Sequence, residues 1–115
     1  MGILILGLDP WIHGKEARNV MAGYVYIITN HKKGTLYIGV TSDLEGRIHE
    51  HREGLTPGFA SRYGCTRLVW YEQHEHISDA IQREKSLKRW YRKWKIDLIE
   101  AMNPGWNDLY LDLNR

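Results

Sequence analysis

The feature that most constrains this chain is a pair of short alternating segments joined by a polar turn. In residues 24–28, Val25 and Ile27 fall on one side and tyrosines on the other, which is typical of a half-buried strand. Residues 30–34 are polar and end in glycine, so residues 35–41 are expected to return as the second strand of a hairpin. The hairpin favours an antiparallel sheet.

The remaining pattern predicts helices around a third strand. Ser42 and Glu45 have the spacing of a capping box, which predicts a helix over residues 43–53. A third strand is expected over residues 66–72. Ser78 is expected to cap a long helix that reaches about residue 93 and continues, with breaks, to residue 102. The order ββαβαα predicts a layered α+β domain with helices covering a small sheet.

Length and composition exclude several classes of protein. A chain of 115 residues is about one domain, and 43% hydrophobic with 26% charged residues is typical of a globular protein. The apolar stretch at residues 3–8 is too short to span a membrane or to act as a secretion signal. The single cysteine, Cys65, excludes an internal disulfide and a Cys-rich zinc site, and it fits a cytoplasmic protein.

The first twenty residues differ from the rest. Residues 1–20 show no clear period and are interrupted by glycine and proline, whereas a regular pattern begins at Met21. We therefore expect residues 1–20 to be an N-terminal extension and residues 21–115 to be the functional domain. Translation starting at Met21 is one hypothesis for this difference.

Positive charge is concentrated late in the chain. The net charge is only +2, but residues 67–95 carry eight basic and four acidic side chains, and residues 96–115 are net negative. Aromatic residues lie among the basic ones, as expected of a helix that faces nucleic acid. The alternative is an ordinary solvated helix face. The candidate substrate-binding residues here are Lys85, Lys88, Arg89 and Arg92.

The register of the hairpin suggests a site on one face. The expected core-facing residues are Val25, Ile27, Leu36, Ile38 and Val40. Tyr26 and Tyr37 then project from the opposite face, and Gly39 on that face allows a ligand to approach the backbone. Two phenols beside a bare strand could position water or phosphate, or they could be ordinary cross-strand partners.

The first predicted helix adds two candidates to this face. Leu44, Ile48 and Leu55 form an apolar stripe, with Arg47 beside it and His51 almost on it. Arg47 and His51 are four residues apart, so they share a helix face. The alternative is an amphipathic helix whose histidine is merely hydrogen-bonded.

Glu84 is the most informative residue of the second predicted helix. It falls inside an apolar stripe formed by Ala80, Leu87, Tyr91 and Trp94. A carboxylate buried without a partner costs several kcal/mol, so Glu84 needs a cation, either a metal or Arg47. A single hard oxygen ligand suits Mg²⁺, which keeps most of its waters. A structural ion pair is the alternative.

The ordered set Tyr26, Tyr37-Ile38-Gly39, Arg47, His51 and Glu84 resembles the GIY-YIG nuclease superfamily. The likeness covers about residues 23–109 and is strongest to small single-domain bacterial members. It implies a three-stranded antiparallel sheet flanked by helices.

The resemblance also implies roles for the matching residues. Tyr26, with help from Tyr37, would orient or deprotonate the attacking water. Arg47 would stabilise the pentavalent phosphate, and His51 would assist proton transfer. Glu84 would hold one divalent cation, Mg²⁺ or Mn²⁺.

A late asparagine, Asn107, resembles an asparagine near the family's site. The first motif departs from the family, since Tyr24-Val25-Tyr26 replaces Gly-Ile-Tyr and keeps only its last tyrosine. No separate DNA-recognition domain is evident, unlike in homing and restriction members.

The sequence therefore predicts a metal-dependent endonuclease that hydrolyses DNA phosphodiester bonds and selects DNA structure, or sequence only weakly. RNA stays open as a substrate, and a protein partner is possible. One alternative is a nucleic-acid-binding module whose catalysis is vestigial or depends on a partner. Another is a protein-interaction domain whose basic helix docks on an acidic partner.

Overall fold

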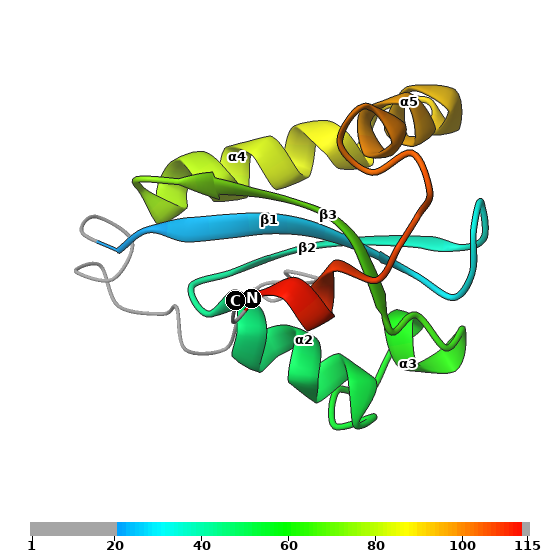
Figure 1. Ribbon diagram of the computed structural model, residues 1–115. Helices are drawn as coiled ribbons and strands as arrows, with labels where there is room; N and C mark the ends of the chain where they lie inside the picture. The colour runs from blue at the N-terminus through cyan, green and yellow to red at the C-terminus, as the bar shows by residue number, and fades with distance from the viewer. Residues whose placement is uncertain (1–20, 114–115) are drawn as a thin grey trace.

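A computed structural model describes residues 21–113, and the predictions about residues 1–20 lie outside this range. The described chain forms three strands, four α-helices and a short 3-10 helix (Figure 1). In chain order these are β1 (Gly23–Thr29), β2 (Leu36–Thr41), α2 (Leu44–Arg52), α3 (Phe59–Arg62), β3 (Arg67–His74), α4 (Ile77–Lys88), α5 (Arg92–Met102) and η1 (Leu109–Asp112). None of the helices described is long and apolar enough to cross a membrane.

The sheet confirms the predicted α+β fold. Its strand order is β2-β1-β3, and both neighbours pair antiparallel with β1. The hairpin register places Tyr26 opposite Gly39 and Ile28 opposite Tyr37, so these four side-chain positions share one face. An irregularity in the β1–β3 pairing follows Ile27.

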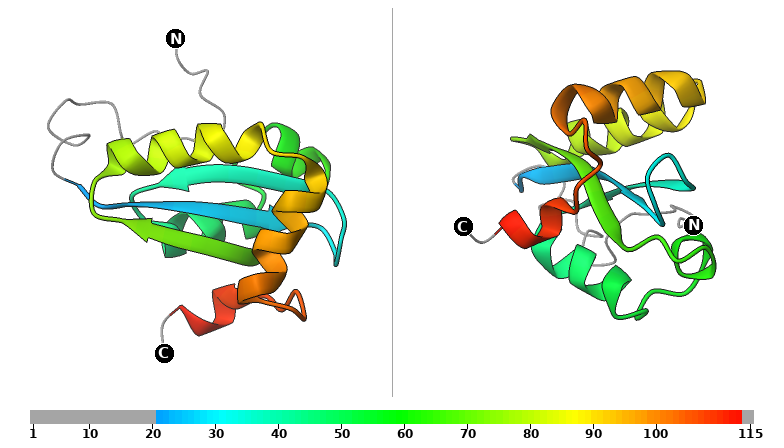
Figure 2. Two further views of the ribbon diagram at one scale, coloured as in Figure 1. Left: turned by 90° about the horizontal axis from the view of Figure 1, so that it is seen from above. Right: turned by 45° about the vertical axis from the view of Figure 1, so that its right-hand side comes forward.

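Helices cover both faces of the sheet. Helices α4 and α5 lie on one face, whereas α2, α3 and η1 lie on the other (Figure 1). Seen from above, α4 runs along the strands and α5 crosses them (Figure 2). The fold therefore has a sheet between two layers of helices, and each layer has its own core.

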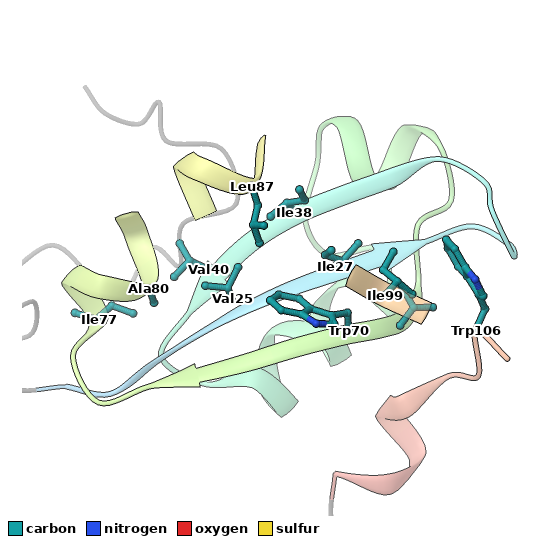
Figure 3. Packing of buried hydrophobic residues seen from close by; sticks show 11 residues of the cluster. Val25, Ile27, Ile38, Val40, Trp70, Ile77, Ala80, Leu87, Ile99 and Trp106 are labelled. Atoms are coloured by element: carbon teal, nitrogen blue, oxygen red, sulfur yellow. The ribbon is translucent and has the colours of Figure 1, made fainter. Parts of the chain in front are cut away.

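The first core lies between the sheet and α4 and α5 (Figure 3). The alternation in the hairpin correctly predicted its strand residues, because Val25, Ile27, Ile38 and Val40 are all buried here and Leu36 packs beside them. Trp70 and Trp106 belong to the same cluster, with Trp90 at its edge. The cluster members are Val25, Ile27, Ile38, Val40, Val69, Trp70, Ile77, Ala80, Leu87, Ile99 and Trp106.

The second core lies between the sheet and α2 and α3. It contains Tyr26 together with aliphatic residues and the buried Cys65. The cluster members are Tyr26, Ile28, Leu44, Ile48, Ala60, Cys65 and Leu68. The hairpin register predicted that Tyr26 projects from the face opposite Val25 and Ile27, and there it packs with residues of α2 and is fully buried.

Several predicted helix ends were wrong. Asp43, not Ser42, caps α2, because its carboxylate accepts a hydrogen bond from the Gly46 amide at 3.1 Å. Helix α2 ends at Arg52, so Leu55 lies beyond it and is 65% exposed instead of continuing the apolar stripe. Ser78 lies inside α4 and does not cap it, since the cap position is one residue before Ile77.

The long second helix is also broken earlier than predicted. Helix α4 ends at Lys88, and α5 starts in a new direction at Arg92. Tyr91 and Trp94 therefore leave the stripe that holds Glu84, and they are 71% and 49% exposed. Neither α3 nor η1 was predicted, because each has only four residues.

Candidate active site

Tyr26 is the centre of the candidate site, and Gly39 makes room for it. A Cβ atom added to Gly39 would lie 2.4 Å from both Cζ and the hydroxyl oxygen of Tyr26, so the phenol ring crosses directly over this glycine. Any side chain at this position would displace the ring. The sequence suggested that Gly39 lets a ligand approach the strand. Instead, the space beside this glycine is filled by the ring of the tyrosine opposite it.

His51 joins Tyr26 from α2. Its Nε2 atom lies 2.9 Å from the Tyr26 hydroxyl oxygen, and its Nδ1 atom lies 3.1 Å from Oγ1 of Thr56. Burial, with a contribution from the Arg47 charge, lowers the pKa of His51 to about 4. The imidazole is therefore neutral at pH 7 and can accept a proton.

Arg47 completes a buried polar cluster one turn earlier on α2. Its guanidinium bonds to Glu50 Oε1 at 3.0 Å and to the Tyr26 phenol. Burial favours the neutral form, but the Tyr26 and Glu50 interactions outweigh it and raise the pKa of Arg47. Its Nε atom is buried and has no hydrogen-bond partner within residues 21–113, so one N–H of a permanent cation is unsatisfied.

Tyr37 lies next to this cluster. Its ring meets the His51 ring edge-on, with 5.6 Å between centroids, and stacks on Phe59 at 6.2 Å. Burial raises the pKa of Tyr37, the Arg47 charge partly offsets this, and the Glu84 carboxylate adds to the increase. Tyr37 is therefore influenced by the charges of both Arg47 and Glu84.

Glu84 enters from α4, the helix on the other face of the sheet. It is 2% exposed, and its Oε2 atom forms an ion pair with Nζ of Lys88, one turn further along α4. The cation that the sequence required is thus present as Lys88 and not as Arg47. Burial raises the pKa of Glu84, although Lys88 and Lys85 counteract this effect.

A metal at Glu84 would have few protein ligands. Within the part of the chain that the structure describes, no three His, Cys, Asp or Glu side chains come close enough to hold a metal ion. A single carboxylate still fits Mg²⁺, which takes most of its ligands from water and phosphate. Lys88 is about one-third exposed, so it can leave the carboxylate for solvent when a cation binds.

The other sequence candidates have separate surroundings. Asn107 is exposed, and its backbone is held by the side chain of Asn103, which also donates to the Val69 carbonyl of β3. The hydrogen bonds of Asn107 among the described residues are with Asn103, which is anchored to β3, whereas the Tyr26 ring lies over Gly39 of β2, on the other side of β1. Asn107 therefore stays a prediction.

The basic candidates divide into two groups. Lys85 and Arg89 are exposed on α4 and at its end. Arg92 instead donates from Nη2 to the carbonyls of Lys33 and Gly34 at 2.6 and 2.7 Å, so it tethers the β1–β2 turn to α5. This structural role was not evident from the charge pattern.

The sequence also gave no signal for three residues near the site. Thr56 bonds to His51, and Phe59 and Tyr63 continue the ring contacts from Tyr37, with 4.7 Å between their own centroids. All three lie between the helix predicted over residues 43–53 and the strand predicted over residues 66–72, where the sequence predicts no helix or strand. Their positions depend on the turn after α2 and on α3.

A sheet covered on both faces, with two tyrosines, an arginine and a histidine gathered at α2 and a buried glutamate on α4, defines a GIY-YIG-type catalytic domain. The GIY-YIG catalytic domain model matches residues 22–97. The chain belongs to the GIY-YIG family, which confirms the predicted resemblance, and membership indicates a nuclease-type domain.

The relatives of this chain are small bacterial proteins. It is 34% identical over 76 residues to the UPF0213 protein of Staphylococcus saprophyticus, covering 66% of this chain and 92% of that protein. It is 36% identical over 78 residues to a UPF0213 protein of Clostridium perfringens, covering 68% and 83%. The solution structure of a Bacillus halodurans UPF0213 protein matches with a TM-score of 0.49 and 29% identity, covering 76% of this chain and 93% of that one.

Proposed function

We propose that this protein is a metal-dependent endonuclease that hydrolyses phosphodiester bonds in DNA. The observation that carries the proposal is the buried cluster of Tyr26, His51 and Arg47, in which a neutral imidazole and an incompletely bonded guanidinium meet at one phenol. A proton acceptor beside a fixed positive charge is what attack of water on a phosphate diester requires.

One side chain of the cluster stabilises negative charge, and two others transfer protons. Arg47 offers its free Nε–H to a phosphate oxygen and stabilises the negative charge that grows in the transition state. Tyr26 takes a proton from the attacking water as its own phenolic proton passes to Nε2 of His51. The new P–O bond forms as the bond to the leaving sugar oxygen breaks, and that oxygen takes a proton from solvent.

Tyr37 is the point of entry to this cluster. Tyr26 has no exposed surface, whereas Tyr37 is only partly buried. A phosphate therefore meets Tyr37 and Arg47 first, and the side chains around Tyr26 must shift before water reaches its hydroxyl. The need for this shift favours substrates that can place a backbone phosphate close to β2.

Glu84 would hold the divalent cation, Mg²⁺ or Mn²⁺. When bound, the metal supplies Lewis-acid polarisation of the scissile phosphate. Lys88 favours the ionised form of the buried carboxylate, because an ammonium group on Oε2 partly opposes the increase in pKa that burial causes. We expect this endonuclease to select DNA structure, or to select sequence only weakly.

The test is cleavage of plasmid and branched DNA by the wild type and Glu84→Gln, each with Mg²⁺, Mn²⁺ or EDTA. The isosteric amide removes the metal ligand, so cutting should require metal and should disappear in this variant. Glu75→Gln is the matched control, because Glu75 is an exposed carboxylate just before α4. A folded wild type that cuts no DNA with either metal would overturn the proposal.

A second candidate function is nucleic-acid binding without cleavage. The exposed corner between α4 and α5 favours it, since Tyr91 and Trp94 meet there with 4.7 Å between ring centroids, near the basic Arg89. Retention of DNA that weakens steeply as salt rises, with no cutting under either metal, would establish this function instead.

A further inference from the structure

Thr56 extends the buried cluster by one residue. Its hydroxyl lies 3.1 Å from Nδ1 of His51, and the other ring nitrogen, Nε2, lies 2.9 Å from the Tyr26 phenol. Both nitrogens of a histidine that is only 5% exposed are therefore engaged by side chains. The imidazole bridges one residue from a loop and one from the central strand.

The turn after α2 brings Thr56 to this place. The chain reverses at Gly54, which has a left-handed φ of 70°, and the Leu55 amide then bonds back to the Glu50 carbonyl at 2.9 Å. Pro57 follows, and it favours an extended conformation for the residue before it. The hydroxyl of Thr56 is thus held against the last turn of α2 by backbone geometry.

The donors and acceptors in this cluster determine where the hydrogens of Tyr26 and His51 lie. A guanidinium has only donors, so the Tyr26 oxygen accepts from Arg47 and its own hydrogen remains to be donated. The nearby acceptor for it is Nε2 of His51. A neutral imidazole then carries its hydrogen on Nδ1 and donates it to Oγ1 of Thr56.

We propose that Thr56 is a positioning residue that holds His51 in the tautomer whose Nε2 is free to accept the Tyr26 proton. An acceptor on Nδ1 stabilises the Nδ1–H form, and the fixed turn prevents the ring from rotating. The consequence for catalysis rests on the proposed function, but the tautomer itself is a property of the folded chain and can be measured without any substrate.

The first measurement is the tautomer of His51 by long-range ¹H–¹⁵N correlation at pH 7, with the His51 signals assigned by their loss in His51→Gln. The wild type and Thr56→Ser should show a protonated Nδ1 and an unprotonated Nε2. Thr56→Val keeps the branched shape but removes the acceptor, so the tautomer protonated on Nε2 should become populated. An unchanged Nδ1–H tautomer in Thr56→Val would overturn the proposal.

The second measurement is nuclease kinetics with the same variants. Thr56→Val should lower kcat by at least about tenfold with little change in KM, and Thr56→Ser should restore it. Thr66→Val is the matched control, because Thr66 is partly buried like Thr56 and its hydroxyl makes no hydrogen bond within residues 21–113. A Thr56→Val variant as active as the wild type would refute the catalytic role.

The two measurements separate the proposals. If the wild type cuts no DNA, the proposed function fails, and the spectra still decide whether Thr56 sets the tautomer. If the wild type cuts and the spectra of Thr56→Val are unchanged, the positioning role fails alone.

Discussion

Lowering the pH from 7 to 4 should destabilise the folded chain through His51. Burial, aided by the Arg47 charge, places the pKa of His51 at about 4 in the folded protein, whereas an unfolded histidine has a pKa of 6.5. Between these two values the unfolded chain binds a proton at this residue and the folded chain does not. Stability from His51 is therefore fully present above pH 6.5, falls as the pH decreases, and levels off below about pH 4.

The size of the effect follows from the two pKa values. Each tenfold difference in proton affinity between the folded and unfolded states corresponds to about 1.4 kcal/mol. The interval from 6.5 to about 4 therefore gives a loss of about 3 kcal/mol, which is a large part of the stability of a small domain.

Glu84 acts in the opposite direction over part of this range. Burial raises its pKa in the folded protein, so the folded chain binds a proton at Glu84 more readily than the unfolded chain. Acidification through that range stabilises the fold at this residue. The His51 contribution must therefore be measured as a difference between variants.

Urea unfolding of the wild type and His51→Gln at pH 7 and pH 4 isolates the effect. Glutamine cannot titrate, so the wild type should lose about 3 kcal/mol more than His51→Gln between these pH values. His49→Gln is the control, since His49 is an exposed histidine on the same helix, and it should behave like the wild type. Equal pH dependence in the wild type and His51→Gln would refute the reasoning.

Three further substitutions test other parts of the structure. Gly39→Ala should displace the Tyr26 ring, because the new Cβ would lie 2.4 Å from it, and nuclease activity should fall about 100-fold in a cleavage assay while the circular dichroism spectrum stays native. Asn103→Ala should cost about 1–3 kcal/mol in urea unfolding, because the Val69 carbonyl of β3 and the Asn107 backbone would lose their hydrogen bonds to the Asn103 side chain. Arg92→Ala should speed hydrogen exchange in the β1–β2 turn, and a loss of DNA affinity without faster exchange would contradict its tethering role.

The hairpin and its two faces could be predicted from the sequence because a strand repeats every two residues. Val25 and Ile27 face one core and Tyr26 faces the other, as the alternation required. The same alternation could not show that a second helical layer covers Tyr26. That depends on how α2 returns across the sheet, which is a tertiary property.

The helix ends were predicted less well, since they depend on interactions that local patterns do not record. Residues 89–91 contain no glycine or proline, so nothing in the sequence marked the break between α4 and α5. The periodicity of one continuous helix was extended past this break. Tyr91 and Trp94 were consequently assigned to a buried stripe that ends at Leu87.

The need of Glu84 for a cation could be predicted from the energetic cost of burying a carboxylate. An apolar helix stripe with one carboxylate required a cation, and the structure supplies Lys88. A glutamate–lysine pair four residues apart on an exposed helix face gains only a few tenths of a kcal/mol, and burying its carboxylate adds a desolvation cost. Stability alone therefore does not account for a carboxylate that is 2% exposed, and this imbalance is one reason for the proposal that Glu84 binds a cation.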